Sequence, residues 1–244
     1  MIELFFNEFL STFPFHILAC VPFHKRLRHS PWKTFLWVCG FELGYLLLFM
    51  FLIQIGLSSV WVQYLALPCF GVLFKLMVDA EIGMILFLYL FIIDYLLVVR
   101  AAAFCICQAL FDYDFFSWET GLVTFLLVLC SIYFMAKAMT RTVEGLSSVS
   151  IPSFWNTAWL LPASVTLILL LLTGNIRSGT ITIAALMARF MLLICMFLIS
   201  HFMILFIQQL REQLEANARS EAMERLLQIQ HDQYTMPTAA IWRI

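Results

Sequence analysis

Charged side chains are scarce in this chain. Asp, Glu, Lys and Arg together make up 12% of its 244 residues, and the formal net charge is −1. Water-soluble domains carry about twice that charged fraction, so a water-soluble globular domain is not the expected class. No run or face of basic residues is large enough to bind a nucleic acid, and none is expected as a partner.

Metal and redox motifs are also lacking. Seven cysteines are scattered through apolar stretches, and the closest pair, Cys105 and Cys107, is two residues apart. That spacing matches neither a redox CxxC motif nor a zinc site. We therefore expect no metal and no cofactor. The sequence also shows no internal repeat, whereas duplicated halves are typical of transporters; this disfavours a transporter without excluding one.

Apolar residues dominate what is present. They make up 63% of the chain, with 25 phenylalanines. A bilayer is crossed by about 20 apolar residues, and such stretches predict an all-α, polytopic membrane helical bundle of about seven spans. Only Asp79, Ala80 and Glu81 separate the third and fourth spans, which could be two crossings or one re-entrant unit. The expected spans are 3–23, 34–57, 61–79, 82–100, 120–139, 155–173 and 181–207.

The distribution of Lys and Arg predicts the orientation of these spans. The first loop, HKRLRHSPWK, holds four basic residues, and Lys75, Lys137 and Arg141 follow or close later odd-numbered spans. The opposite loops hold Arg100 and the acidic stretch FDYDFFSWET. We expect the N-terminus outside and the C-terminus inside. The expected domains are a transmembrane sensor domain (1–207), a cytoplasmic linker and dimerisation helix (208–236) and a disordered tail (237–244).

Ionisable residues within the spans are candidates for a site, because each costs about 2.5–3.5 kcal/mol to insert. At about 1.5 Å per residue, Asp94 lies about 9 Å and Arg189 about 12 Å below the outer ends of their spans. This depth predicts an Asp94–Arg189 pair between spans four and seven. Such a pair could fix helix order, form part of a ligand pocket or switch, or relay protons.

A second group of charges lies nearer the inner side. By the same depth argument, Glu42 is level with His201 and Lys75. Lys75 can also reach Asp79 at the i,i+4 spacing. We expect these four residues to form structural charge pairs.

The outer ends of the spans are rich in aromatic residues. An interfacial aromatic belt looks like this without any ligand; an outward pocket for an apolar or peptide signal is the alternative. The segment 104–119 is the longest expected external segment and is the first place to look for such a pocket. The candidate ligand-binding residues are Asp94, Arg189, Trp61, Tyr113 and Trp118.

Beyond Ile207 a single apolar stripe continues along a charged helix. Its members are three or four residues apart, as in a narrow two-stranded contact, but consecutive spacings of four would locally unwind a supercoil. The pattern favours a weak parallel homodimer over an interfacial helix, for which the apolar face is too thin. The expected dimerisation residues are Leu210, Leu214, Ala218, Ala222, Leu226 and Ile229.

The segment ERLLQIQHDQYTM, after seven spans and a long helix, resembles the linker of AgrC-like (GHKL-type) sensor histidine kinases. In that family a segment of the form LLxLQxxQYxxL precedes the phosphoacceptor motif HDxRHH. The resemblance implies the input half of a two-component, quorum-type kinase in a bacterial plasma membrane, receiving an extracellular peptide or small-molecule signal. The matching residues are Leu226, Leu227, Gln230, Gln233 and Tyr234.

The chain departs from that family after Met236. Pro237 follows where the family's helix continues, and TAAIWRI contains neither a phosphoacceptor motif nor ATP-binding motifs. His231 precedes Gln233 and Tyr234 rather than following them. We therefore expect a truncated sensor that is not itself an enzyme. The alternatives are a membrane transporter and a membrane peptidase that uses His16 and Cys20.

Overall fold

The computed structural model describes residues 2–57, 59–111, 115–147, 152–176 and 182–241. Within these ranges every regular element is a helix, and the only β-type pairing is an isolated bridge between Leu27 and Val78. The expected all-α class is confirmed. The chain divides into two compact units, Met1–Ser200 and His201–Ile244, each of which is described by itself below.

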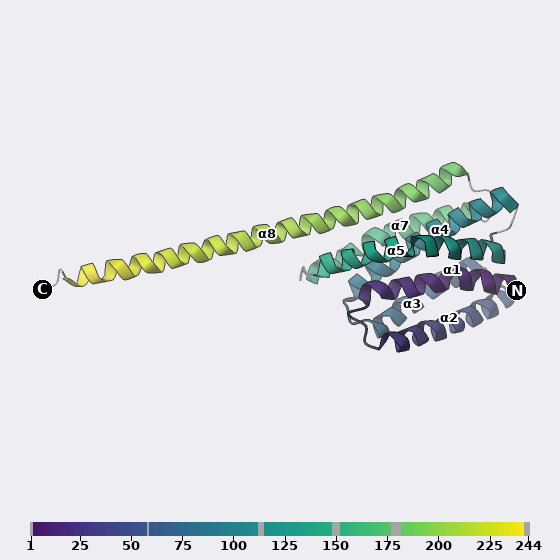
Figure 1. Cartoon of the computed structure of the whole chain (residues 1–244), viewed down its shortest axis with the longest axis horizontal. Helices are drawn as coiled ribbons and strands as arrows, with labels where there is room; N and C mark the ends of the chain where they lie inside the picture. Colours follow the sequence, from purple (N-terminus) through teal and green to yellow (C-terminus); the bar gives the residue numbers. More distant parts are fainter. Residues whose placement is uncertain (1, 58, 112–114, 148–151, 177–181, 242–244) are drawn as a thin grey trace. The chain divides into compact units, whose positions relative to one another are not determined.

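The first unit is a bundle of apolar helices, seen side by side in Figure 1. Among the described residues, six helices of the chain are long and apolar enough to cross a membrane, and Pro68–Met77 is a shorter apolar stretch. The length and apolar composition of these helices make the chain a multi-pass membrane protein. The elements are α1 (Ile2–Cys20), η1 (Val21–Phe23), α2 (Pro31–Gln54), α3 (Ser59–Met77), α4 (Ile82–Phe111), α5 (Trp118–Ser147), α6 (Pro152–Ala158), α7 (Leu160–Ile176) and α8 (Ile183–Ile241).

Helix α4 is the central helix of the bundle. It contacts α1, α3, α5, α6 and α7, and 17 of its 30 residues are buried. Its sequence is apolar on every side, as expected of a helix that neighbours surround. Helices α2 and α5 also expose large apolar side chains, such as Leu47 and Phe134.

One end of the bundle gathers the basic loops. The backbone N–H of Arg28 donates to the carbonyl of Met77, and that of Asp79 donates to the carbonyl of Arg26, both at 2.9 Å. The Nζ of Lys25 lies 2.9 Å from Oε1 of Glu144, near the end of α5. The C-terminal ends of α1, α3 and α5 therefore lie together, in agreement with the pattern of loop charges.

The expected end of the fourth span at residue 100 is wrong. Helix α4 continues to Phe111, so residues 104–111 are helical, and Phe104 and Cys107 among them are buried. No Gly or Pro interrupts residues 101–111. Arg100 does not mark a membrane surface, because its side chain is buried. The third and fourth spans are two separate helices, α3 and α4.

The expected span 155–173 is divided into α6 and α7. Pro162 lacks an N–H, and its ring clashes with the carbonyl of the residue four positions earlier. That residue is Ala158, where α6 ends. The Nε1 of Trp159, which separates the two helices, donates to the carbonyl of Asn156 at 3.0 Å.

The second unit is the C-terminal part of α8. Its described side chains from Glu212 to His231 are all exposed. The Nε of Arg211 donates to Oε1 of Glu215 at 2.8 Å, and this cation lowers the pKa of the Glu215 carboxyl. The helix continues through Pro237 to Ile241. The expected tail is therefore helical over 237–241, and residues 242–244 lie outside the described ranges.

A glycine marks a close approach between α1 and α5 in the bundle. A Cβ on Gly121 of α5 would lie 2.8 Å from Cα of Asn7 on α1. A Cβ on Gly44 of α2 would meet nothing within 4 Å. Gly121 is thus required by packing between α1 and α5, whereas Gly44 has no such neighbour in the described structure.

We predict that Gly121→Ala destabilises the bundle by about 1–3 kcal/mol, the usual effect of overpacking. Gly44→Ala is the matched control, and we expect no loss, because Ala favours a helix over Gly by about 1 kcal/mol. Thermal unfolding in detergent, followed by circular dichroism, measures both. Equal melting temperatures for the two variants would contradict the close approach of α1 and α5.

Candidate functional site

A buried polar cluster joins α1 to α4. The guanidinium of Arg100 holds the Glu8 carboxylate at two points, with Nη2 2.9 Å from Oε1 and Nη1 3.3 Å from Oε2. Nη2 also donates to Oδ1 of Asn7 at 3.1 Å. Asn7 and Glu8 are fully buried, and Arg100 is 7% exposed. We call these three residues the Glu8–Arg100 cluster.

The cluster also holds the segment that leads into α5. The Nδ2 of Asn7 donates to the carbonyl of Ser117 at 2.6 Å and to that of Phe115 at 3.3 Å. The Arg100 guanidinium lies 5.1 Å from the centre of the Phe115 ring, within the range of a cation–π contact. Three parts of the chain distant in sequence therefore meet at one set of charges.

An apolar groove lies beside this cluster. It has a volume of about 460 Å³ and contains one acidic residue, Glu3. Its wall includes Phe6 and Trp118, which are sequence neighbours of Asn7 and Ser117. Asn7 and Ser117 are themselves joined by a hydrogen bond. The lining residues are Ile2, Glu3, Phe6, Leu10 and Trp118.

A second buried cluster joins α1, α2 and α3. Nδ1 of His16 lies 2.8 Å from Oε2 of Glu42, and Thr12 donates its hydroxyl to Oε1 of the same carboxylate. The His16 ring stacks on Phe70 with 3.7 Å between ring centres. Glu42 of α2 is therefore paired with His16 of α1, and the ring of that His16 stacks on Phe70 of α3.

The charge pairs expected from depth alone are wrong for Glu42, Lys75 and Asp79. Glu42 is held by His16 and Thr12, not by Lys75 or His201. The Nζ of Lys75 donates to the carbonyl of Ala80 at 2.8 Å, and Asp79 pairs with Arg28 at 3.3 Å. His201 belongs to the second unit and is exposed.

The expected Asp94–Arg189 pair is also not formed. Oδ1 of Asp94 accepts a hydrogen bond from Thr166 at 2.6 Å. Because α4 ends at Phe111, Asp94 lies about 25 Å from that end, whereas Arg189 lies about 9 Å from the start of α8. The depth argument failed because it placed the end of α4 eleven residues too early.

Arg189 is instead level with the last turns of α4. Its side chain is 1% exposed, and its three guanidinium nitrogens have no hydrogen-bond partner in the described structure. Leu186, one turn earlier on α8, packs against a cluster formed by Ala101, Phe104 and Phe115.

Of the five residues expected to bind a ligand, the three with described side chains do not converge on one pocket. Trp118 lines the groove between α1 and α5, while Asp94 and Arg189 are buried at different depths. The side chain of Trp61 and the whole of Tyr113 lie outside the described residues. The sequence reasoning missed Asn7, Glu8 and Arg100. Glu8 within the first span was the available signal, since an acid at that depth requires a partner.

The side chains of His16 and Cys20, the possible peptidase pair, are not hydrogen-bonded to each other. The thiol of Cys20 donates to the backbone carbonyl of His16 at 3.5 Å, while the His16 ring faces Glu42. Among the described residues, no group of three or more His, Cys, Asp or Glu side chains could hold a metal ion. What the described geometry offers is paired charges beneath an apolar groove.

No protein-family model, curated protein or solved structure matches this chain.

We predict that Arg100→Gln destabilises the bundle by about 3–5 kcal/mol, because it leaves the Glu8 carboxylate buried without its cation. The double variant Glu8→Gln/Arg100→Gln removes both charges and should recover much of this loss. Unfolding in mixed micelles with increasing denaturing detergent measures each free energy.

The exposed pair Lys25 and Glu144 provides the control. Lys25→Gln should leave stability unchanged within error, because exposed ion pairs contribute little. If the Glu8→Gln/Arg100→Gln double variant were no more stable than Arg100→Gln alone, the two charges would not be coupled as described.

Proposed function

We propose that this protein is a membrane-embedded signal-sensing module, similar to the input half of a quorum-type histidine kinase. One observation carries the proposal. Helix α8 is a single helix from Ile183 to Ile241, apolar where it belongs to the bundle and charged, with an exposed apolar stripe, in the second unit. Such a helix is suited to carrying a change in the bundle along its own length.

The proposed signal docks in the groove lined by Phe6 and Trp118. The groove is mainly apolar and opens at the end of the bundle opposite the basic loops. An extracellular peptide or small molecule with an apolar surface would suit it, since ligand sites are mostly apolar with few polar groups. Glu3 would favour a ligand with a positive charge.

Packed side chains connect this groove to α8. Ser117 and Phe115, just before Trp118, are held by Asn7. Phe115 stacks edge-on against Phe104 at 5.4 Å between ring centres, and Leu186 of α8 packs against both. A shift of the segment 115–118 would therefore change the contacts of the first turn of α8.

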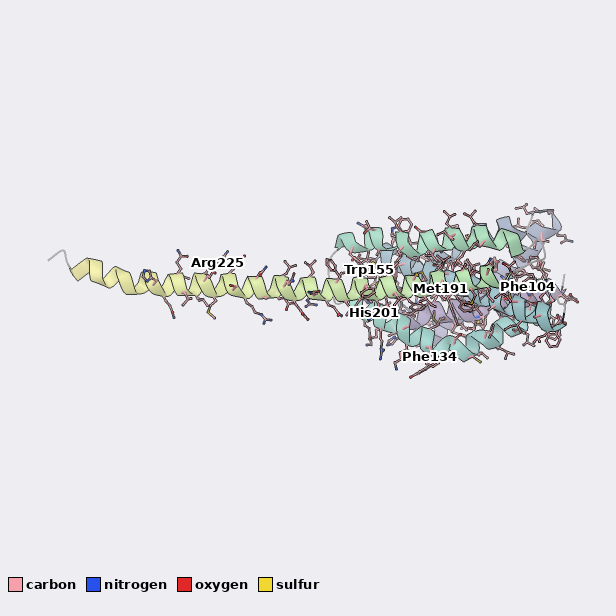
Figure 2. All side chains as sticks on the ribbon, turned by 90° about the horizontal axis from the view of Figure 1, so that it is seen from above. Phe104, Phe134, Trp155, Met191, His201 and Arg225 are labelled. Carbon is pink, nitrogen blue, oxygen red and sulfur yellow. The ribbon has the colours of Figure 1, made fainter. Side chains whose placement is uncertain are left out.

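In this proposal the protein is a homodimer, and the change in α8 reaches the contact between its two helices. The second unit supports such a homodimer. The expected stripe is exposed along its length, with Leu214 at 59% and Leu226 at 59%. A shallow groove of about 310 Å³ follows the stripe and is flanked by Glu221 and Arg225; Arg225 is labelled in Figure 2. In a parallel pair these opposite charges would lie beside those of the partner helix.

We predict that Ala218→Cys forms a disulfide-linked dimer on mild oxidation, whereas Ala216→Cys does not. The two alanines are two residues apart, which places them about 200° apart around the helix, so only Ala218 lies on the stripe. Non-reducing gel electrophoresis measures the product, and the wild-type chain controls for its seven native cysteines. Equal crosslinking at both positions would contradict a dimer contact along the stripe.

The same cysteine reports the orientation of α8. A membrane-impermeant maleimide should label Ala218→Cys in inside-out vesicles and leave it unlabelled in intact cells. Labelling in intact cells would place the second unit outside the cytoplasm, and the proposed sensor would then have to be abandoned.

Coupling is tested by a substitution in the bundle. We predict that Leu186→Ala changes the yield of the Ala218→Cys dimer, because it removes the contact of α8 with Phe104 and Phe115. Met187→Ala is the control, since Met187 is the next residue and is 58% exposed. Unchanged yields in both variants would mean that α8 does not report the state of the bundle.

A further inference from the structure

One exposed face of α5 changes from apolar to cationic along its length. Leu126, Leu129 and Tyr133 are exposed by 50%, 48% and 66%, and Lys137 and Arg141 follow them, both exposed. The steps along this row are three or four residues, so all five side chains lie on one side of the helix. The row runs toward the end of the bundle that holds the basic loops.

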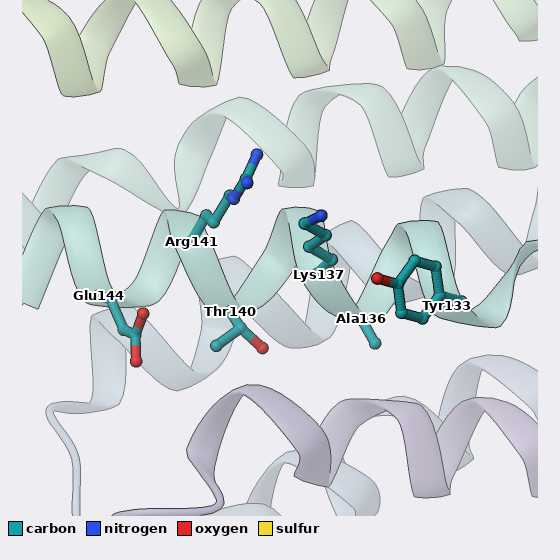
Figure 3. Close-up of a pocket in the computed structure, with 6 residues that line it drawn as sticks. All are labelled: Tyr133, Ala136, Lys137, Thr140, Arg141 and Glu144. Carbon is teal, nitrogen blue, oxygen red and sulfur yellow. The ribbon is translucent and has the colours of Figure 1, made fainter.

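The cationic part of this face is hollowed. Figure 3 shows Tyr133, Lys137 and Arg141 in succession along α5, lining a groove of about 440 Å³ together with Ala136, Thr140 and Glu144. The Nζ of Lys137 lies 5.7 Å from the centre of the Tyr133 ring. A cation and an aromatic ring at the end of a membrane helix are typical of the bilayer surface.

The two cations of the groove have no acidic partner within the described ranges. The nearby carboxylate, that of Glu144, is 2.9 Å from the Nζ of Lys25. Neither Lys137 nor Arg141 forms an ion pair with a described carboxylate. The groove therefore presents two uncompensated positive charges to whatever occupies it.

The apolar part of the row faces outward. Phe134, next to Tyr133, is 71% exposed and projects from the edge of the bundle in Figure 2. Leu126 lies about 16 Å along the helix from Lys137, and one leaflet of hydrocarbon is about 15 Å deep. An acyl chain whose headgroup lies at Lys137 would thus extend as far as Leu126.

We propose that this face of α5 binds one anionic phospholipid. The phosphate lies between Lys137 and Arg141, and an acyl chain lies along Tyr133, Leu129 and Leu126. Arginine contacts phosphate through two N–H groups and lysine as a point charge. The charge complementarity of the groove favours an anionic over a zwitterionic headgroup, and the apolar row requires a tail. This site does not depend on the proposed sensing function.

The test compares the full chain in nanodiscs of phosphatidylcholine with and without a minor fraction of phosphatidylglycerol. Native mass spectrometry after release from the nanodisc counts the retained lipids. We expect the wild-type chain to retain one phosphatidylglycerol preferentially. Lys137→Gln/Arg141→Gln should weaken retention by about tenfold or more, since each cation near an anionic lipid contributes about 1 kcal/mol and 1.4 kcal/mol is tenfold.

The matched control is Arg26→Gln/Lys33→Gln, which removes the same charge from the same end of the bundle. It should retain phosphatidylglycerol like the wild type, and circular dichroism should show equal helix content in all variants. An equal loss of phosphatidylglycerol retention in both double variants would overturn the site, because retention would then depend on the net charge of the protein alone. Equal retention of the two lipids would also overturn it, as would displacement by free glycerol phosphate.

Discussion

The ion pair between Glu8 and Arg100 sets the relative depth of α1 and α4 within the bundle. A charged side chain among apolar helices is tolerated only when it is neutralised and hydrogen-bonded. Here Glu8 and Arg100 neutralise each other, and Arg100 also donates to Asn7. A shift of α1 by one turn along α4 would separate the two groups. The segment before α5 is held to the same point because the Nδ2 of Asn7 donates to the carbonyls of Phe115 and Ser117.

The helices themselves were predictable because their signal is local. A run of apolar residues long enough to cross a bilayer forms a helix whatever its neighbours are. Helices α1, α2 and α3 begin and end close to the runs that predicted them, and α5 and α8 begin close to theirs. The C-terminal stripe was read in the same way, from spacing along a single helix. The break before α7 required one further local fact, the position of Pro162 relative to Ala158.

The candidate site was predictable only in part, because its contacts join distant segments. Arg100 looked like the end of a span, since charges usually lie at membrane surfaces. Its partner, Glu8, is 92 residues away, and nothing in the spacing of either residue shows that they meet. This error led to a second one. Because the expected end of α4 was too early, Asp94 and Arg189 were expected at the same depth. In the structure Asp94 accepts a hydrogen bond from Thr166 instead. Trp118, which was expected to bind a ligand, lines a groove, and its position at the end of a span is a local property.

The buried charges are satisfied unequally across the bundle, and this inequality bears on how α8 is held. Glu8, Arg100, Glu42 and His16 are paired and fix α1 to α2 and α4. Arg189 is buried on α8 with no hydrogen-bond partner in the described part of the chain. A buried cation without a partner opposes the packing of its own helix. The contacts of Leu186 and the burial of Arg189 therefore act in opposite directions on the first turns of α8. The proposed coupling would act on these turns, and coupling between sites is typically worth about 1–3 kcal/mol.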